Sequence, residues 1–114
     1  MKRLFVQASS FSVEIKSLKQ GEIVLREIEN AILSNPQSGD IVTGTGGVRK
    51  LRIADNRRGK GKRGGFRVLY LDLPHCEKTH LVFIYGKDEL DDISADGKKV
   101  IRDLVKAIKE EAHE

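Results

Sequence analysis

Three segments in the second half of the chain carry the residue pattern of β-strands, and their succession limits the folds open to the protein. Segment 48–53 alternates, so that Lys50 and Arg52 share one face and apolar residues occupy the other. Segment 66–73 is rich in aromatic and β-branched residues, and segment 80–86 contains the apolar run of a central strand buried on both faces. Successive strands joined by short links form an antiparallel sheet.

Two segments with helical periodicity precede these strands. The first has apolar residues at helical spacing over 11–18, behind Ser9 and Ser10, either of which is a candidate N-cap. The second covers 21–33 and ends before Pro36, because proline disfavours helical geometry in the residue before it. We expect the two to form a helical hairpin.

A final helix and an initial strand complete the predicted fold. Segment 4–6 is an apolar run long enough for one strand, and Ser94 is a good N-cap for a closing amphipathic helix. The turn between the last two strands falls at 74–78, where proline and charged residues gather. The predicted order is β-α-α-β-β-β-α, an α+β fold in which helices pack an antiparallel sheet.

The length of 114 residues predicts one domain, residues 1–114, with a single hydrophobic core. One cysteine excludes an intramolecular disulfide framework. No segment approaches the roughly 20 apolar residues of a membrane span, and the first thirty residues contain no signal-peptide pattern. We therefore expect a cytoplasmic protein that does not bind membranes.

The placement of positive charge predicts a phosphate-rich partner. The whole chain has a formal net charge of +4, but segment 49–67 holds nine basic residues against Asp55. Such a concentration is the electrostatic footprint of nucleic-acid binding, although a solvated basic loop without a partner has the same composition. The nine basic residues are Arg49, Lys50, Arg52, Arg57, Arg58, Lys60, Lys62, Arg63 and Arg67.

A glycine pattern inside this basic segment resembles a nucleotide-binding fingerprint only formally. Segment 59–64 reads Gly-x-Gly-x-x-Gly, but that fingerprint requires a preceding strand and a following helix, and here a strand follows. No Gly-Lys pair is followed by Ser or Thr, which excludes a Walker A motif. We interpret segment 55–65 as a basic arm whose glycines let the backbone approach a ligand.

Two other clusters invite chemical interpretations that we consider weaker. His75, Cys76 and His80 lie close in sequence, but a fourth metal ligand with suitable spacing is missing. A catalytic thiol–imidazole pair of Cys76 and His75 is also disfavoured, because neighbouring residues on an extended chain usually point apart. The acidic segment 88–92 suggests a divalent-metal site, yet acids also favour the start of a helix. A third interpretation is that these acids help to offset the positive charge of the basic face. We expect no metal and no cofactor.

The constellation with most chemical meaning is cationic. Lys50 and Arg52 share a strand face, Arg67 begins the next strand, and Lys87 follows the third. If these strands are neighbours, three or four cations converge on one surface of the sheet. We expect that surface to lie outside the core, because burying unpaired cations is very costly. An ordinary solvent-facing sheet surface remains the alternative.

Three segments together resemble the RelE/HigB toxins of bacterial toxin–antitoxin systems. They are 44–52, 61–70 and 84–89, and the similarity is greatest to the HigB-like branch with a loop rich in glycine and lysine. The resemblance spans nearly the whole chain, because Asn35-Pro36 and the closing amphipathic helix also fit.

The resemblance implies a metal-independent endoribonuclease, an mRNA interferase that inhibits translation by cleaving messenger RNA in the ribosomal A site. It assigns Lys50, Arg52, Arg67 and Lys87 as catalytic residues, with Asp88 where RelE-like members place an arginine. The implied RNA-binding residues are Arg49, Arg57, Arg58, Lys60, Lys62, Arg63, Tyr70 and Tyr85.

The implied reaction is attack of the ribose 2′-hydroxyl on the adjacent phosphate, which leaves a 2′,3′-cyclic phosphate and a free 5′-hydroxyl. Lys50 is the expected proton-transfer group, because Arg52 and Arg67 disfavour a further positive charge beside them. The expected partners are mRNA, the ribosome and a cognate antitoxin with a helix-turn-helix DNA-binding domain. A non-catalytic toxin of the same fold that inhibits gyrase, and an RNA- or ribosome-binding module, remain open alternatives.

Overall fold

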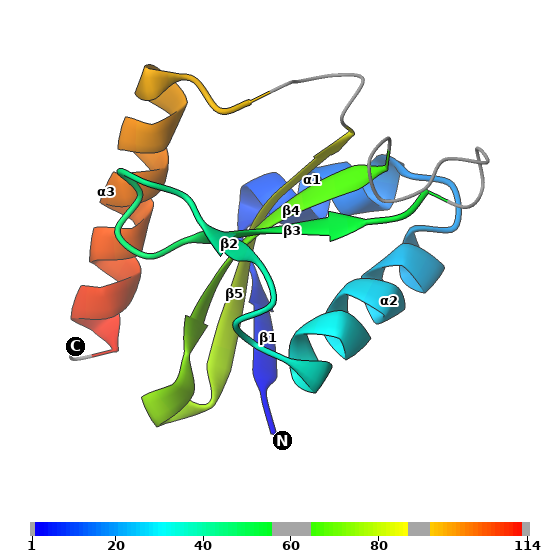
Figure 1. The fold of residues 1–114 in the computed structure, drawn as a ribbon, viewed down its shortest axis with the longest axis horizontal. Helices are drawn as coiled ribbons and strands as arrows, with labels where there is room; N and C mark the ends of the chain where they lie inside the picture. Colours follow the sequence, from blue (N-terminus) through cyan, green and yellow to red (C-terminus); the bar gives the residue numbers. More distant parts are fainter. Residues whose placement is uncertain (1, 56–64, 87–91, 113–114) are drawn as a thin grey trace.

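The computed structural model describes residues 2–55, 65–86 and 92–112. Within these ranges the α+β class predicted from the sequence is confirmed, with three α-helices and a five-stranded sheet (Figure 1). The elements in chain order are β1 (Leu4–Gln7), α1 (Ser9–Ser17), α2 (Gly21–Ser34), β2 (Asp40–Ile41), β3 (Arg49–Ile53), β4 (Phe66–Leu73), a 3-10 turn (Pro74–Cys76), β5 (Lys78–Gly86) and α3 (Ala95–Glu111).

The sheet is mixed, whereas the sequence predicted an antiparallel one. The strand order is β1-β5-β4-β3-β2, and the three pairs formed by β2 to β5 are antiparallel. Strand β1 instead runs parallel to β5, with Leu4 opposite Lys78 and Gln7 opposite Leu81. This parallel pairing is possible because the long connection between β1 and β5 includes both helices of the α1–α2 hairpin. The two-residue strand β2 was not predicted.

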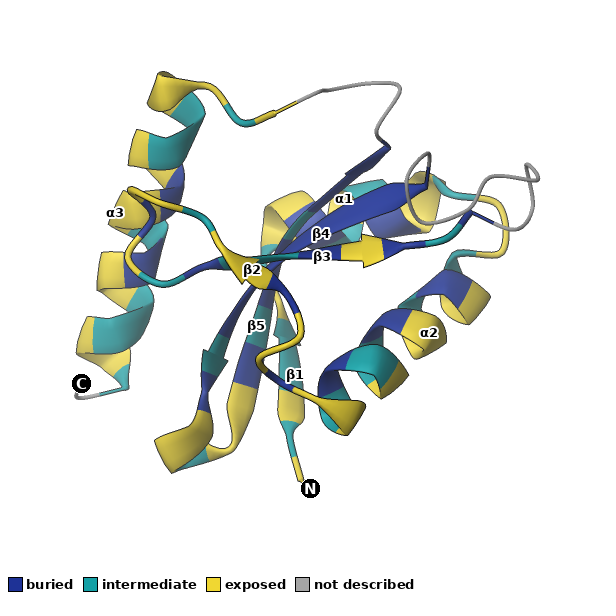
Figure 2. Ribbon diagram, viewed as in Figure 1, coloured by how far each residue is buried: buried dark blue, intermediate teal, exposed yellow. Residues whose placement is uncertain are grey.

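Helices cover both faces of the sheet. Helices α1 and α2 lie on one face and α3 lies on the other (Figure 1). On the first face Phe11, Ile28 and Ile32 pack with residues of β3, β4 and β5, and each of the three is fully buried. The central strands β4 and β5 are accordingly the most continuously buried part of the chain (Figure 2).

Helix α3 covers only part of the second face. Its Ile101 and Val105 pack with Leu69 and Leu71 of β4 and with Val82 of β5. Because side chains alternate along a strand, Arg67, two positions before Leu69, points to this same face, where its partner across the ladder, Tyr85, belongs to the apolar cluster.

The helix starts follow the predicted capping in one case and not in the other. The Ser94 hydroxyl accepts a hydrogen bond from the Gly97 amide at 3.0 Å, which confirms Ser94 as the N-cap of α3. The prediction for α1 is wrong, because its N-cap is Ala8 and no side chain caps the helix. The Ser10 hydroxyl instead donates to the Val82 carbonyl at 2.6 Å and fastens α1 to β5.

A buried tyrosine fixes the chain where it returns from α2 to the sheet. The Tyr70 hydroxyl donates to the Pro36 carbonyl at 2.8 Å and accepts from the Gly39 amide at 3.1 Å. Gly39 is required here, because a Cβ at this position would lie 2.8 Å from the Lys50 carbonyl oxygen. The contact sets the position of β2 beside β3.

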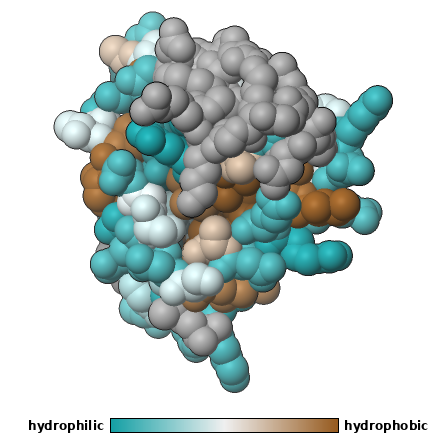
Figure 3. All heavy atoms as spheres, turned by 45° about the vertical axis from the view of Figure 1, so that its right-hand side comes forward, coloured by the Kyte–Doolittle hydropathy of each residue, from teal (hydrophilic) through white to brown (hydrophobic). Residues whose placement is uncertain are grey.

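The surface combines polar areas with a few large apolar side chains. Figure 3 shows apolar residues among polar ones on the face that is turned forward from the right-hand side of Figure 1. The large apolar side chains that are most exposed are Leu4, Val13, Ile23, Ile41 and Val100. None of the helices in the described ranges is both long and apolar enough to cross a bilayer.

Candidate functional site

Three residues from three neighbouring strands form a row across the second face of the sheet. Arg52 of β3 is directly opposite Arg67 of β4, and Arg67 is directly opposite Tyr85 of β5. Residues in register on adjacent strands point to the same face, so the two guanidinium groups and the phenol lie side by side. The predicted convergence of Arg52 and Arg67 on one face is borne out by this register.

A second row lies next to the first, one pleat along the strands. Lys50 is opposite Leu69, and Leu69 is opposite Phe83. The Lys50 ammonium lies 3.9 Å from a carboxylate oxygen of Asp92, which precedes α3. Lys50 therefore shares the face of Arg52 and Arg67, as predicted, and its acidic neighbour Asp92 comes from the segment 88–92 that the sequence analysis noted.

Burial differs sharply among these cations. Arg52 is exposed and Lys50 is partly exposed, whereas Arg67 is only 5% exposed. One guanidinium nitrogen of Arg67 donates to the Phe66 carbonyl at 3.3 Å. The sequence led us to expect all of these cations on an open surface, so the burial of Arg67 is a correction. A buried guanidinium is held more rigidly than an exposed one. Arg67 is therefore suited to act as a positive charge of fixed position.

The Tyr85 hydroxyl is buried beside this guanidinium. It has no hydrogen-bond partner within the described ranges, and the residue is 4% exposed. Burial raises the pKa of Tyr85, the Asp92 carboxylate raises it further, and the positive charge of Arg67 acts in the opposite direction. The phenol is therefore protonated at neutral pH, and its hydrogen-bond donor is unused by the described part of the chain.

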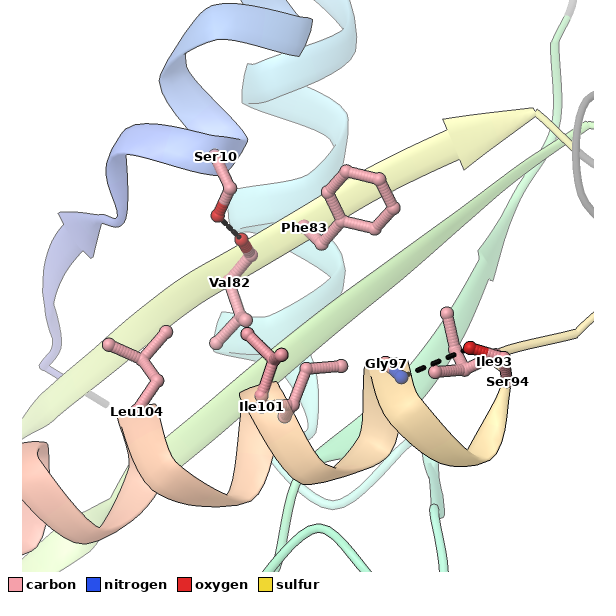
Figure 4. Close-up of a pocket in the computed structure, with 9 residues that line it drawn as sticks. Ser10, Val82, Phe83, Ile93, Ser94, Gly97, Ile101 and Leu104 are labelled. Carbon is pink, nitrogen blue, oxygen red and sulfur yellow. Dashed lines mark hydrogen bonds between the residues drawn. The ribbon is translucent and has the colours of Figure 1, made fainter.

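Phe83 extends the site towards an apolar groove. Its ring stacks on that of Tyr85, with centroids 5.8 Å apart. Phe83 also lines a groove of about 360 Å³ between α1, β5 and the first half of α3, together with Ser10, Val82 and Ile101 (Figure 4). The groove and the row of cations thus meet at the Phe83–Tyr85 pair.

Two residues predicted to bind RNA lie on the opposite face. Arg49 is in register with Tyr70, and its guanidinium donates to the Gly39 carbonyl at 2.8 Å and to the Gln37 carbonyl at 3.3 Å. Tyr70 is fully buried in the core formed with α1 and α2. Neither joins the row formed by Arg52, Arg67 and Tyr85.

The remaining predicted site residues lie outside the described residues. They are the catalytic candidate Lys87 and the RNA-binding candidates Arg57, Arg58, Lys60, Lys62 and Arg63. Most of the acidic segment 88–92 lies outside as well, and only Asp92 is described.

The histidine–cysteine cluster has one unexpected contact. The Cys76 sulfur lies 3.5 Å from a ring nitrogen of His75, although we expected the two side chains to point apart. Both lie in the exposed or half-exposed turn between β4 and β5. No group of three or more potential metal-ligating side chains occurs among residues 2–55, 65–86 and 92–112.

The arrangement is suited to binding a phosphate whose charge increases during a reaction. Two guanidinium groups, one ammonium and one neutral phenol donor face the same side of the sheet. Preorganised cations and donors of this kind stabilise negative charge on phosphate oxygens, and the planar arginine fork matches phosphate geometry. Asp92 was noted in the sequence only as one of the acids that could offset the basic face. Phe83 was missed as a neighbour of the site, because an aromatic residue in an apolar strand also fits a place in the core.

Comparison with known protein families identifies the family of this chain. The family model described as RelE toxin of the RelE / RelB toxin-antitoxin system matches residues 11–114. The match begins within α1 and includes every strand and helix that contributes to the row of cations. The chain therefore belongs to the RelE toxin family of toxin–antitoxin systems.

Proposed function

We propose that this toxin is a metal-independent endoribonuclease that cleaves messenger RNA in the A site of the ribosome and so inhibits translation. The observation that supports this best is the row Arg52, Arg67 and Tyr85, since like charges directly opposite each other on a sheet are destabilising. A face that keeps two guanidinium groups in register at this cost is well suited to an anionic reactant.

The reaction we propose is an internal transesterification. The ribose 2′-oxygen attacks the adjacent phosphorus, the bond to the 5′-oxygen of the next nucleotide breaks, and the products are a 2′,3′-cyclic phosphate and a 5′-hydroxyl. The proton leaves the 2′-hydroxyl and a proton is delivered to the 5′-oxygen, so no external reactant is consumed. Arg52 and Arg67 stabilise the charge that gathers on the phosphate oxygens.

Proton transfer is assigned to the residues next to the arginines. Lys50 lies on the same face of the sheet as the two arginines, and this position supports a role in moving a proton at the reacting oxygens. The Tyr85 hydroxyl is placed beside Arg67 and supports the phosphate by donating a hydrogen bond. Lys87 remains a predicted fourth cation, and its sequence position next to Gly86 is what supports that role.

The proposed partners follow from the same function. The substrate is mRNA on the ribosome, and the cognate antitoxin implied by the family is proposed to carry a helix-turn-helix DNA-binding domain. Within the family, the glycine- and lysine-rich segment 59–65 supports the HigB-like branch.

The test is to induce the protein without its antitoxin in bacteria and map new 5′ ends of messenger RNA. Wild type is compared with Arg67→Ala and with a matched control, Arg26→Ala, which removes an exposed arginine of α2 on the other face. We expect new ends within coding frames for wild type and for the control, and none for Arg67→Ala. The ends should accept phosphate from a polynucleotide kinase without prior dephosphorylation, because they carry 5′-hydroxyls.

Two results would contradict the proposal. Growth arrest with intact messages would indicate a non-catalytic toxin, directed at gyrase or at passive ribosome binding. Cleavage that persists when ribosomes are kept off the message would disprove ribosome dependence but retain the nuclease.

A further inference from the structure

Strand β5 contains one residue more than the stretch of β4 with which it pairs. The register moves by one between Leu69 and Tyr70 of β4, and Val82 of β5 has no residue of β4 opposite it. An extra residue of this kind is a β-bulge, which bends its strand, increases the local twist and re-aims the side chains that follow. The bulge lies just before Tyr85, the third member of the row across the second face.

The bulge decides which face of the sheet Tyr85 occupies. Leu81 and Tyr85 are four residues apart, an even separation that places both side chains on one face of a regular strand. In the structure Leu81 instead packs in the core formed with α1 and α2, and Tyr85 packs in the cluster formed with α3. Val82 and Phe83 are consecutive and both pack in the second cluster, so the change of face occurs at the bulge. With Leu81 in the same place and no bulge, Tyr85 would point away from Arg67.

The start of α1 holds the bulged part of β5 in place. The Ala8 amide donates to the Leu81 carbonyl at 2.9 Å. The Ser10 hydroxyl donates to the Val82 carbonyl at 2.6 Å, and Figure 4 shows this bond directly before Phe83. The pairing of β1 with β5 ends at Leu81, so the carbonyl of the bulge is satisfied by a side chain rather than by a strand.

Ser10 makes this contact from an exposed position and does not cap its helix. The N-cap of α1 is Ala8, which forms no side-chain hydrogen bond. A second serine of α1 makes a bond of similar length elsewhere, because the Ser12 hydroxyl donates to the side-chain oxygen of Gln7 at 2.8 Å. Ser12 therefore offers a matched control, a serine of the same helix whose hydroxyl bond does not involve β5.

The bulge is followed directly by the aromatic pair of the site. The Phe83 ring stacks on the Tyr85 ring with centroids 5.8 Å apart, and Tyr85 is directly opposite Arg67. A change in the bend at Val82 moves this aromatic pair relative to β4. The distance between the Tyr85 hydroxyl and the Arg67 guanidinium then changes as well.

We propose that Ser10 is a positioning residue for Tyr85: by holding the Val82 carbonyl, it fixes the bulge that places the Tyr85 phenol beside Arg67. Ser10 acts through the backbone of β5 and takes no direct part in the reaction. The inference rests on the proposed function for the role of Tyr85 in cleavage. The placement of Tyr85 itself is measurable without RNA.

The first measurement follows the Tyr85 ring directly. The protein contains two tyrosines, so labelling with fluorotyrosine gives two fluorine signals, which Tyr85→Phe assigns. Ser10→Ala and the control Ser12→Ala are compared with the parent protein. We expect the Tyr85 signal to shift or broaden in Ser10→Ala only. The signal of Tyr70, which lies in the core on the opposite face, should keep its position in every variant and so report that each is folded.

The second measurement is single-turnover cleavage of a message on programmed ribosomes. Ser10→Ala should lower the rate at saturating ribosomes by about three- to tenfold, the order expected for loss of one neutral hydrogen bond, and leave the half-saturating concentration unchanged. Ser10→Thr keeps a hydroxyl and should restore the rate. In a Tyr85→Phe background Ser10→Ala should cause no further loss, because Ser10 acts through the phenol.

Three results would overturn the inference. They are a Tyr85 signal that keeps its position in Ser10→Ala, an equal shift of that signal in Ser12→Ala, and a further loss of cleavage from Ser10→Ala in the Tyr85→Phe background. If the wild-type protein cleaves no RNA, the nuclease proposal fails, whereas the fluorine signals still decide whether Ser10 positions Tyr85.

Discussion

Arg52 and Arg67 face one another across the β3–β4 ladder, one exposed and one buried, with Tyr85 next in the same row. The two guanidinium groups can therefore reach one phosphate from different depths. In the proposed mechanism the buried Arg67 is the fixed group, and the exposed Arg52 is the one that meets the incoming RNA strand first.

This pairing predicts non-additive effects on cleavage. Arg67→Ala should reduce the cleavage rate by about 10²–10³-fold, comparable to the loss of one oxyanion donor, and Arg52→Ala should reduce it in the same direction. If both residues stabilise the same phosphate, the double variant should lose less than the product of the two single losses. The measurement is single-turnover cleavage of a programmed ribosomal message, with Arg26→Ala as the control. Strictly multiplicative losses would show that the two arginines act independently.

Removing the Tyr85 hydroxyl should lower the cleavage rate without lowering the stability of the fold. The hydroxyl is buried without a partner in the described part of the chain, and such a group carries a desolvation cost of about 1–3 kcal/mol. Tyr85→Phe should therefore unfold at an equal or higher urea concentration than wild type. Cleavage should fall if the phenol donates to the phosphate. A clear loss of stability would show that the hydroxyl has a structural role.

The same substitution at Tyr70 should have the opposite effect on stability. Its hydroxyl bonds to both Pro36 and Gly39 in the core, so Tyr70→Phe leaves a buried carbonyl and a buried amide without this partner. We expect a loss of about 1–3 kcal/mol in the free energy of unfolding, measured by urea titration. Comparison with Tyr85→Phe makes each variant the control of the other, since both remove one phenol oxygen.

Acid should weaken the fold through His80. Burial lowers the pKa of His80, the nearby Lys78 lowers it further, and Glu111 acts in the opposite direction. The unfolded chain therefore binds a proton more readily than the folded protein, so the contribution of His80 to stability is complete above about pH 6.5 and is lost as the pH falls towards its folded-state value. Urea titrations at about pH 7.5 and about pH 5.5 should show this difference.

His80→Gln should reduce the pH dependence, because it removes the group whose pKa burial lowers. An unchanged pH dependence in His80→Gln would assign the effect to other groups.

Local patterns predicted the parts of the fold that local interactions determine. Strand β4 was predicted with its observed bounds, since Gly65 and Pro74 flank a mostly apolar run that includes Phe66, Val68 and Tyr70. The N-cap at Ser94 was predicted for the same reason, because the cap and its amide lie three residues apart. Strand β2 was missed because two residues cannot show a periodic pattern.

Long-range features were predicted less well. The parallel pairing of β1 with β5 joins segments more than seventy residues apart, and the short run 4–6 contains nothing that specifies its partner. In the site, strand alternation was sufficient to place Lys50, Arg52 and Arg67 on one face. The burial of Arg67 depends on how tertiary packing encloses the end of the sheet, and the contact of Lys50 with Asp92 depends on the path of the chain before α3. Neither is present in the strand pattern.

The parallel pairing of β1 has a consequence for the order in which the protein folds during its synthesis. Strand β1 leaves the ribosome first, but it can pair only after residues 78–81 have followed, and closing so long a loop is entropically costly and slow. The β3–β4 and β4–β5 pairs join neighbouring segments and can form earlier. Loop length therefore favours alignment of Arg52, Arg67 and Tyr85 before β1 docks, so we expect the proposed site to form ahead of this edge of the sheet.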